Sequence, residues 1–253
     1  MGIVAFQWGE GENILTLLMN RDNWEDRDIS RASWNGNGEI LSGRSAETNG
    51  TWLGISRGGR VAFLVYEGPI SCINRIIGAE CLTLEFLQSN ESPEDFAKSL
   101  AADSGRNTKI AYHLIVADIA SNSMFQIFKP VDGIVHTRPV GPGVHTLSSS
   151  GLDCEVRDRD LRLKNSFGDM INRGLPSQMG ELPEIMYDPV RADGRSPLSS
   201  IFIVDTTYEK GNYGTRSTTA LVVKPTNDVM FFERYREKFN ENWKDHDFEF
   251  TII

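Results

Sequence analysis

The first residues of the chain alternate between apolar runs and a polar turn. An apolar run over 2–8 is followed by a Gly- and Glu-rich turn and by a second apolar run over 14–19. Runs that are almost continuously apolar are typical of strands buried on both faces, so we expect a buried hairpin. The second run stops abruptly at the Asn-Arg-Asp sequence of residues 20–22. This change predicts a strand end followed by a long polar loop over 20–38, of the length that lids often have.

Apolar periodicity along the rest of the chain predicts strands in groups, with helices inserted between the groups. Strands are expected over 39–43, 51–56, 61–66, 111–119, 124–128, 144–147, 200–206, 218–223, 229–235 and 248–252. Helical spacing predicts helices over 75–88, 93–103 and 158–173, and a weaker one over 177–187. Two strand groups with two helical groups predict an α+β fold, a four-layer α/β/β/α sandwich, in a single domain over 1–253.

Charge and composition restrict the class of partner. The net charge is −9 over 253 residues, which argues against nucleic acid or an anionic membrane surface as the main partner. No apolar run reaches the length of a membrane span, and no secretory leader precedes the first strand, so we expect a cytoplasmic protein. The spacing of the histidines and acids does not predict a metal site.

A basic cluster begins the helix expected over 158–173. Its four cations are interleaved with Asp158 and Asp160, and this pattern predicts a solvent-exposed helix face rather than a binding patch. The cations are Arg157, Arg159, Arg162 and Lys164.

Three polar clusters, at 20–22, 50–54 and 214–219, coincide with predicted strand ends. If Arg21 and Asp22 lie at a buried sheet end, both need partners. Arg216 would then add a second cation, and two arginines beside one carboxylate leave an excess of positive charge. Such a place suits a carboxylate or a phosphate. The alternative is a structural ion pair that holds the strand ends together.

The same clusters resemble motifs of the transport and Golgi organisation family, also called the NRDE-motif family. The matching blocks are L-L-x-N-R-D at 17–22, E-I-L-S-G at 39–43, G-T-W-L-G-I-S at 50–56, L-I-V-A-D at 114–118 and G-T-R-S-T-T-A-L at 214–221. The resemblance implies an N-terminal-nucleophile hydrolase fold. It also implies links to haem trafficking, acyl-CoA binding and lipid homeostasis, and a location in the cytoplasm, mitochondria or Golgi.

The chain departs from the family pattern at the positions that would perform hydrolysis. The family usually begins Met-Cys, whereas Gly2 has no side-chain nucleophile. Asn23 stands where the NRDE motif has its glutamate, and His113 and Ser149 stand where the family has asparagines. Asparagines at comparable positions of related hydrolases help to stabilise an oxyanion. Amide hydrolysis through residue 2 is therefore disfavoured.

We therefore expect a non-catalytic protein that binds haem, acyl-CoA or a similar lipid-like anionic ligand. Haem would need an axial ligand, for which His113 is the first candidate. Two alternatives stay open: an amide or thioester hydrolase that uses Ser149, Ser217 or Cys154 as nucleophile, and an interaction protein whose ion pairs are structural only. The sequence does not predict the oligomeric state. The expected ligand-binding residues are Gly2, Asn20, Arg21, Asp22, Trp52, His113, Ser149 and Arg216.

Overall fold

The computed structural model describes residues 2–67, 78–103, 110–191, 196–239 and 241–253. The chain divides into two compact units. Unit 1 contains the N-terminal residues up to Arg27 together with Pro142–Thr251, and unit 2 contains Asp28–Gly141 with Ile252–Ile253. Both units therefore combine segments from distant parts of the sequence. The single domain expected over 1–253 stays a prediction.

Unit 1 is built on an 8-stranded antiparallel sheet with the order β11-β10-β1-β2-β13-β14-β15, and β12 pairs with β13. The strands are β1 (Gly2–Trp8), β2 (Leu15–Trp24), β10 (Gly143–Ser148), β11 (Gly151–Leu152), β12 (Thr206–Tyr208), β13 (Gly211–Val223), β14 (Asp228–Tyr235) and β15 (Lys244–Thr251). The predicted hairpin is confirmed as β1 and β2, which pair antiparallel. Every residue of these two strands is buried.

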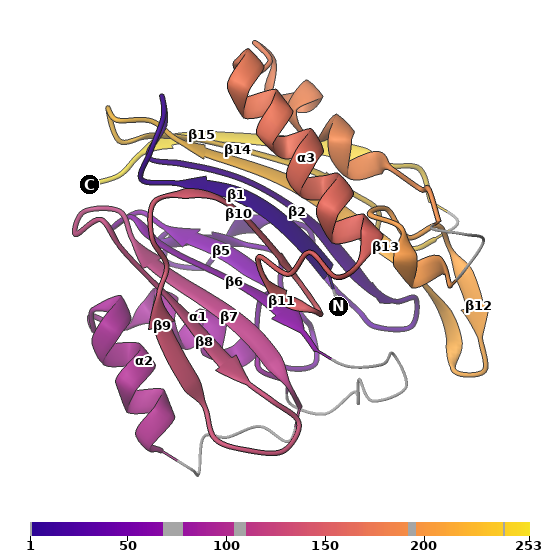
Figure 1. Ribbon diagram of the computed structural model, residues 1–253, viewed down its shortest axis with the longest axis horizontal. Helices are drawn as coiled ribbons and strands as arrows, with labels where there is room; N and C mark the ends of the chain where they lie inside the picture. The colour runs from indigo at the N-terminus through magenta and orange to yellow at the C-terminus, as the bar shows by residue number, and fades with distance from the viewer. Residues whose placement is uncertain (1, 68–77, 104–109, 192–195, 240) are drawn as a thin grey trace. The chain divides into compact units, whose positions relative to one another are not determined.

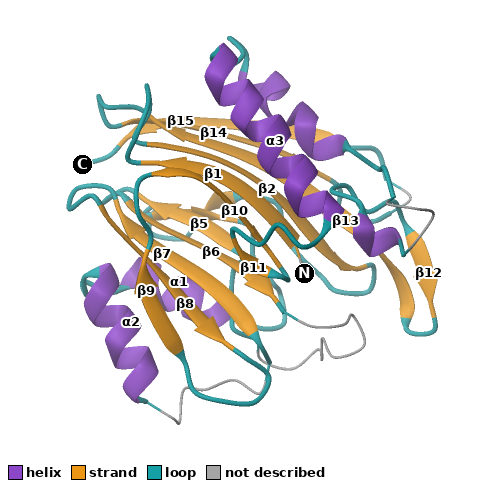
Figure 2. Cartoon of the chain, viewed as in Figure 1, coloured by secondary structure: helices purple, strands orange, loops and turns teal. Residues whose placement is uncertain are grey.

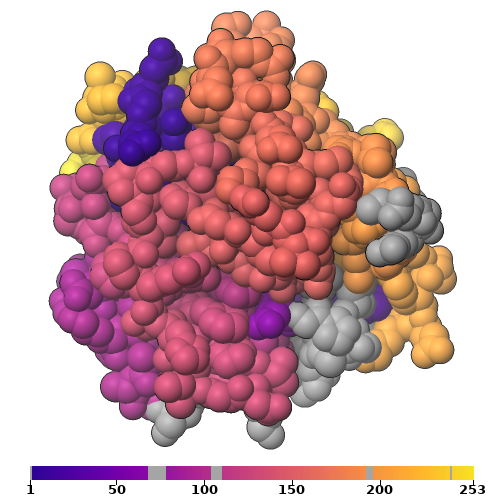
Figure 3. Space-filling model, viewed as in Figure 1, coloured from indigo at the N-terminus to yellow at the C-terminus, as the bar shows by residue number. Residues whose placement is uncertain are grey.

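One face of this sheet is covered by α3 (Asp158–Arg173), which has the predicted bounds (Figure 1). Leu163, Phe167 and Met170 recur at helical spacing and pack with the sheet residues Ala5 and Leu18. The opposite side of α3 lies at the molecular surface (Figure 3). The segment η3 (Met179–Tyr187) adds to the same core as an irregular 3-10 turn rather than the helix expected there, and the short η5 (Pro197–Ser199) follows it.

Unit 2 contains a 7-stranded sheet in the order β3-β4-β5-β6-β7-β8-β9. The strands are β3 (Ser33–Trp34), β4 (Ile40–Ser42), β5 (Leu53–Ser56), β6 (Arg60–Tyr66), β7 (Tyr112–Asp118), β8 (Ser123–Lys129) and β9 (His136–Pro139). Two helices, α1 (Glu80–Gln88) and α2 (Pro93–Ala102), pack against it (Figure 2). As predicted, Ser92 caps α2 by accepting a hydrogen bond from the Asp95 backbone N–H.

The largest correction concerns the end of β2. The strand does not stop at Met19 but continues through Asn20-Arg21-Asp22-Asn23 to Trp24, and all of these residues are buried. The prediction of a polar loop over 20–38 is therefore wrong for its first five residues. The predicted end of β2 was too early because these polar side chains form hydrogen bonds and ion pairs inside the fold. Hydrophobic periodicity does not detect such partners.

Three smaller differences from the prediction concern one strand boundary, one unpredicted strand and one helix start. The strand expected over 200–206 is wrong for residues 200–205, which are irregular, and β12 begins only at Thr206. Strand β9 was not predicted because its four residues carry no apolar alternation. Of the helix expected over 75–88, residues 75–77 lie outside the described part of the chain.

Candidate functional site

Two of the three polar clusters meet at one end of the unit 1 sheet. Strand β2 pairs with β13, so that Asn20 lies opposite Thr218 and Asp22 opposite Thr215. The register shifts between Thr215 and Ser217, which leaves Arg216 as an extra residue in a β-bulge. A bulge redirects a side chain out of the regular alternation. The third cluster, residues 50–54, belongs to unit 2.

Strand geometry separates Arg21 from Asp22. Consecutive side chains of a strand point to opposite faces, so Arg21 and Asp22 do not pair with each other. Asn20 and Asp22 lie on the face covered by α3 and η3, because Asn20 bonds residues packed there. Arg21 lies on the opposite face, where its Nη2 is 3.6 Å from Oε1 of Glu233.

Both polar atoms of the Asn20 side-chain amide form hydrogen bonds within the protein. Its Nδ2 donates to the carbonyl oxygens of Met186 at 2.8 Å and Ile201 at 2.9 Å. Its Oδ1 accepts a hydrogen bond of 2.7 Å from the Thr218 hydroxyl. The residue is 0 % exposed. These bonds connect the end of β2 to β13, η3 and the segment before β12, which is a structural role.

Asp22 belongs to a cluster of buried polar side chains on the sheet face that α3 and η3 cover. Its Oδ1 accepts a 2.8 Å hydrogen bond from the Thr215 hydroxyl. Burial raises the pKa of the Asp22 carboxyl, although this hydrogen bond and the Arg159 charge oppose the shift. The neighbouring Tyr213 hydroxyl has no hydrogen-bond partner among the described residues, and burial followed by the Asp22 charge raises its pKa well above the usual value.

The raised pKa of Asp22 predicts how an Asp22→Asn variant depends on pH. A carboxyl whose pKa is higher in the folded state stabilises the fold below its unfolded pKa, about 3.9, and this contribution is lost as pH rises through the folded pKa. Asparagine does not ionise. We therefore expect the free energy of unfolding of the variant, measured with urea, to increase relative to the original protein as pH rises from 4 to 8.

Asp228 provides a control of opposite sign for this pH series. It is exposed, and hydrogen bonds from Thr226 and Thr251 lower the pKa of its carboxyl. Its stabilising contribution is present above the unfolded pKa, so an Asp228→Asn variant should lose relative stability as pH rises. A pH-independent difference for Asp22→Asn would contradict the raised pKa.

The first turn of α3 contributes two residues to the same cluster of buried polar side chains. Arg159 is 2 % exposed and Asp160 1 % exposed, so the prediction of a solvent-exposed helix face is wrong for these two residues. Arg159 Nη1 donates to the Leu198 carbonyl at 2.7 Å and Nη2 donates to the Ser149 hydroxyl at 3.2 Å. Its Nε lies 3.5 Å from Oδ1 of Asp160. Helical spacing contained the signal, because Arg159 precedes the buried Leu163 by one turn.

Ser149, which was expected to contact ligand, is held by two cations. Its hydroxyl accepts hydrogen bonds from Arg159 and, at 3.3 Å, from Arg157 Nη1. Within the described residues no histidine bonds the hydroxyl of Ser149 or Ser217 or the thiol of Cys154. The feature that would identify an alternative nucleophile, a histidine base within reach, is therefore missing from this part of the chain.

Arg216 lies near Arg21 on the face opposite α3. Its Nη1 donates to the carbonyls of Trp24 at 3.1 Å and Glu25 at 3.2 Å, and its Nε donates to the Arg236 carbonyl at 3.4 Å. Burial, followed by the positive charges of Arg21 and Arg236, lowers the pKa of Arg216 to about 10. Among the described residues no carboxylate forms an ion pair with this guanidinium.

Aromatic rings and a second ion pair surround this cation. The Phe239 ring centre lies 5.2 Å from Cζ of Arg216 and 4.6 Å from Cζ of Arg236. Trp243 lies 4.6 Å from the same Arg236 atom. Arg236 is paired with Asp205 through two hydrogen bonds. The face therefore combines arginine charge with apolar rings. Of its three arginines, Arg216 is the one without a carboxylate ion pair among the described residues, although the charges of Glu25 and Asp205 also act on it.

Gly2 occupies a position that has no room for a side chain. It opens β1 opposite Arg21. A Cβ atom placed on it would lie 2.7 Å from the backbone oxygen of Asn20, closer than real Cβ contacts allow. A side chain at this position would therefore require β1 or β2 to shift.

Two expected site residues belong to unit 2. Trp52 is 1 % exposed and its carbonyl accepts the Leu64 backbone N–H at 2.8 Å. His113 is 4 % exposed and lies in β7, with its ring stacked 4.6 Å from that of Phe128. The Gln126 amide lies 3.3 Å from its Nδ1. Burial, followed by the Arg138 charge, lowers the pKa of His113 to about 4.

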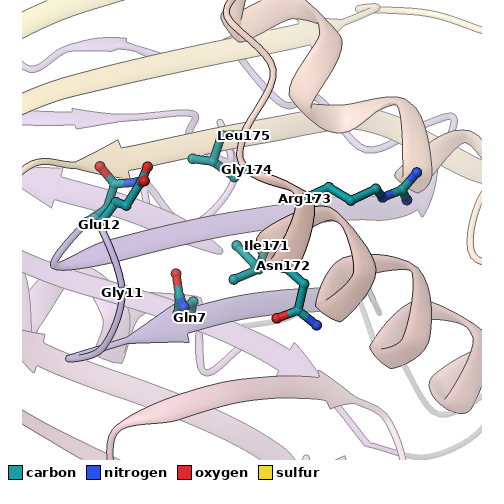
Figure 4. Close-up of a pocket in the computed structure, with 9 residues that line it drawn as sticks. Gln7, Gly11, Glu12, Ile171, Asn172, Arg173, Gly174 and Leu175 are labelled. Carbon is teal, nitrogen blue, oxygen red and sulfur yellow. The ribbon is translucent and has the colours of Figure 1, made fainter.

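A cavity of about 290 Å³ lies elsewhere in unit 1, between the β1–β2 turn and the end of α3. Gln7, Ile171 and Leu175 are among the residues that line it, and the Arg173 side chain extends away from the others (Figure 4). Gln7 is five residues along β1 from Gly2, which places the cavity roughly 17 Å from the strand end at about 3.4 Å per residue. The cavity and the expected site residues therefore do not coincide, and sequence analysis did not identify the cavity.

No helix in the ranges that the structure describes has both the length and the apolar character needed to cross a membrane. The described side chains also include no group of three or more histidine, cysteine, aspartate or glutamate residues arranged to hold a metal ion.

Comparison with known proteins gives matches over almost the whole chain. The family model described as Transport and Golgi organisation 2 matches residues 1–238. The Transport and Golgi organization protein 2 homolog of Bos taurus is 28% identical over 244 residues, covering 87% of this chain and 86% of that protein. The human protein of the same name is 26% identical over 264 residues, covering 94% and 92%.

Two solved structures with similar folds carry the names of hydrolytic enzymes. A variant of the conjugated bile acid hydrolase from Clostridium perfringens has a TM-score of 0.54 at 12% identity, covering 96% of this chain and 92% of that chain. The Caenorhabditis elegans ortholog of N-acylethanolamine-hydrolyzing acid amidase has a TM-score of 0.51 at 11% identity, covering 88% and 92%. These similarities confirm the predicted fold class, α+β of the N-terminal-nucleophile hydrolase type.

Proposed function

Because the chain belongs to the Transport and Golgi organisation 2 family, we propose that it is a non-catalytic ligand-binding protein in a hydrolase-type fold. Its ligand combines anionic groups with an apolar body, as haem and acyl-CoA both do. Its role is to carry such a ligand rather than to cleave it. The cytoplasmic, mitochondrial or Golgi location expected from the family stays a prediction.

The observation that carries the proposal is the environment of Gly2. Hydrolases of this type attack with the side chain of the N-terminal residue of the processed chain. Glycine supplies no such side chain, and the Asn20 carbonyl 2.7 Å from the Cβ position resists any replacement. The residue that would carry the nucleophile thus lacks a side chain, and adding one would strain the strand pair. No histidine among the described residues bonds the Ser149 hydroxyl, so the general base that a substitute nucleophile would need is not supplied there.

Arg216, in the bulge of β13 beside the end of β2, is the residue that supports anion binding. Arg21 and Arg236 have Glu233 and Asp205 as carboxylate neighbours, whereas Arg216 bonds only backbone carbonyls among the described residues. A carboxylate or phosphate would relieve the repulsion among the three guanidinium groups. Phe239 and Trp243 beside these cations offer contact to an apolar group.

Native mass spectrometry of the purified full-length protein tests the proposal first. We expect a co-purifying mass that matches haem or an acyl-CoA. Titration with hemin and with palmitoyl-CoA should then give one-to-one binding. An Arg216→Gln variant should lose about tenfold or more in affinity, because a charge-assisted hydrogen bond contributes about 1.5–3 kcal/mol.

An Arg162→Gln variant is the matched control. Arg162 is another arginine of unit 1, paired with Asp158 and Asp188 on the outer side of α3, and its loss should leave affinity unchanged. Thermal melting without ligand shows whether each variant is folded, and Arg216→Lys keeps the charge if the glutamine variant is not. A folded Arg216→Gln variant with the original affinity would contradict the site. Absence of binding to either ligand would contradict the carrier proposal.

A further inference from the structure

The cavity between the β1–β2 turn and the end of α3 contains a buried amide without a partner in the protein. Gln7 is 8 % exposed and lines this cavity of about 290 Å³. Its amide forms no hydrogen bond with any described residue, and its polar atoms are not fully enclosed. The amide is therefore buried by the protein on most sides and opens to the cavity.

Strand alternation predicts an apolar residue at this position. Ile3 and Ala5 belong to the core beneath α3, and Gln7 is the next residue of β1 on the same face. In the sheet it lies between Thr16 of β2 and Val144 of β10, so it is interior to the sheet and not at its edge. A buried amide without a hydrogen bond destabilises the fold. This cost indicates that the partner of the amide comes from outside the chain.

The two walls of the cavity favour a cation. One wall is the β1–β2 turn, where Glu12 contributes a carboxylate, and the other is the last turn of α3. The last carbonyls of a helix lack donors from a following turn and carry partial negative charge. Arg173 extends away from the other lining residues, and its Nε donates to the Asp169 carbonyl at 3.1 Å (Figure 4). An ammonium group in the cavity therefore has acceptors on both walls.

The remaining lining offers apolar contact and further amides. Ile171 and Leu175 pack against the core of unit 1, and Asn13 and Asn172 bring an amide to each wall. The Gln7 side chain lies between the turn and the helix end (Figure 4), so a ligand bonded to its amide reaches both. The cavity is close to the lower end of the usual range for ligand pockets, about 300–1,000 Å³, which restricts the ligand to a small molecule.

We infer that this cavity is a second ligand site, for a small primary amine that also carries an amide or hydroxyl group and a short aliphatic part. The Glu12 carboxylate and the carbonyl end of α3 bind the ammonium group. The Gln7 amide bonds the neutral polar group, and Ile171 and Leu175 contact the aliphatic part. The site lies within unit 1 on the face covered by α3, whereas Arg216 lies on the opposite face and suits an anion. The inference is therefore independent of the proposed function.

Calorimetric titration of the full-length protein with L-leucinamide tests the site. This probe carries an ammonium group, an amide and an isobutyl group, and we expect it to bind one to one. N-acetyl-L-leucinamide lacks the positive charge, and isovalerate replaces it by a negative one while keeping the aliphatic part. Both should bind at least about tenfold more weakly, because they lose the charge-assisted hydrogen bonds.

Two variants test the assigned contacts. Gln7→Met keeps the length of the side chain and removes its amide, so leucinamide affinity should fall about tenfold. Its melting temperature without ligand should stay the same or rise, since no hydrogen bond within the described protein is lost. Glu12→Gln should weaken leucinamide binding about three- to tenfold. The matched control is Glu10→Gln, the same change at an exposed residue of the same turn outside the cavity lining, which should leave the affinity unchanged.

Absence of saturable leucinamide binding up to about 10 mM would overturn the inference, since a site with these contacts should bind in the millimolar range or tighter. Isovalerate binding as tight as that of leucinamide would overturn it too, as would an equal loss in both glutamate variants. A lower melting temperature of Gln7→Met with unchanged affinity would assign the amide a structural role instead. Hemin and palmitoyl-CoA binding should be unaltered in Gln7→Met, so failure of this site and failure of the carrier proposal give different results.

Discussion

Replacement of Asn20 by alanine is expected to lower the free energy of unfolding by about 3–5 kcal/mol, because it leaves several buried polar groups without partners. The carbonyls of Met186 and Ile201 lose their donor, and the Thr218 hydroxyl loses its acceptor. In a chain of this size such a loss corresponds to a fall in melting temperature of roughly 10 °C. Urea unfolding and thermal melting measure it.

Two further variants separate the contributions to this effect. Thr218→Val removes one of the bonds and should destabilise by about 1–2 kcal/mol. Asn13→Ala removes a single half-buried bond of 3.5 Å to Thr16 and should stay within about 0.5 kcal/mol of the original protein. If Asn20→Ala instead kept its stability and lost ligand affinity, Asn20 would be a ligand contact as the sequence analysis expected.

Replacement of Gly2 by alanine is expected to destabilise the protein by about 1–3 kcal/mol, as overpacking of a filled site does. The added Cβ would lie 2.7 Å from the Asn20 carbonyl oxygen, so either β1 or β2 has to shift. Gly2→Cys should be destabilised at least as much. It should also gain no amide hydrolysis, because His113 and Ser149 stand where the family has the asparagines that would help to stabilise an oxyanion.

Gly36→Ala is the control for this pair, since no heavy atom lies within 4 Å of the added Cβ. We expect its unfolding free energy to stay close to that of the original protein. A Gly2→Cys variant as stable as the original and able to release amine from simple amide substrates would show that an intact hydrolytic site remains. The non-catalytic proposal would then have to be abandoned.

Elements with regular apolar spacing were predictable from the sequence. The bounds of α3 follow from Leu163, Phe167 and Met170, and the β1–β2 hairpin follows from two apolar runs and the turn between them. The same reasoning failed where polar residues continue a buried element. Asn20 and Asp22 extend β2 because distant segments supply their partners, and no local pattern records those partners.

The composition of the site was less predictable than the fold. Charge alone groups Arg21, Asp22 and Arg216 into one site. Strand alternation places the first two on opposite faces, and the β-bulge gives Arg216 a direction that residue counting does not provide. The burial of Arg159 was predictable in principle, since it shares the helix face of Leu163. Because Arg159 is charged, that helix face was instead predicted to be exposed to solvent.

The division of unit 1 between the two ends of the chain has a consequence for protein synthesis. Strand β2 ends at Trp24, and its neighbour β13 begins about 190 residues later. At about 5–20 residues per second, the ribosome needs on the order of 10 to 40 s to deliver that neighbour. The apolar β1–β2 hairpin therefore leaves the ribosome well before the strand that pairs with β2. It is therefore the segment that chaperones have to shield from aggregation while the chain is being made.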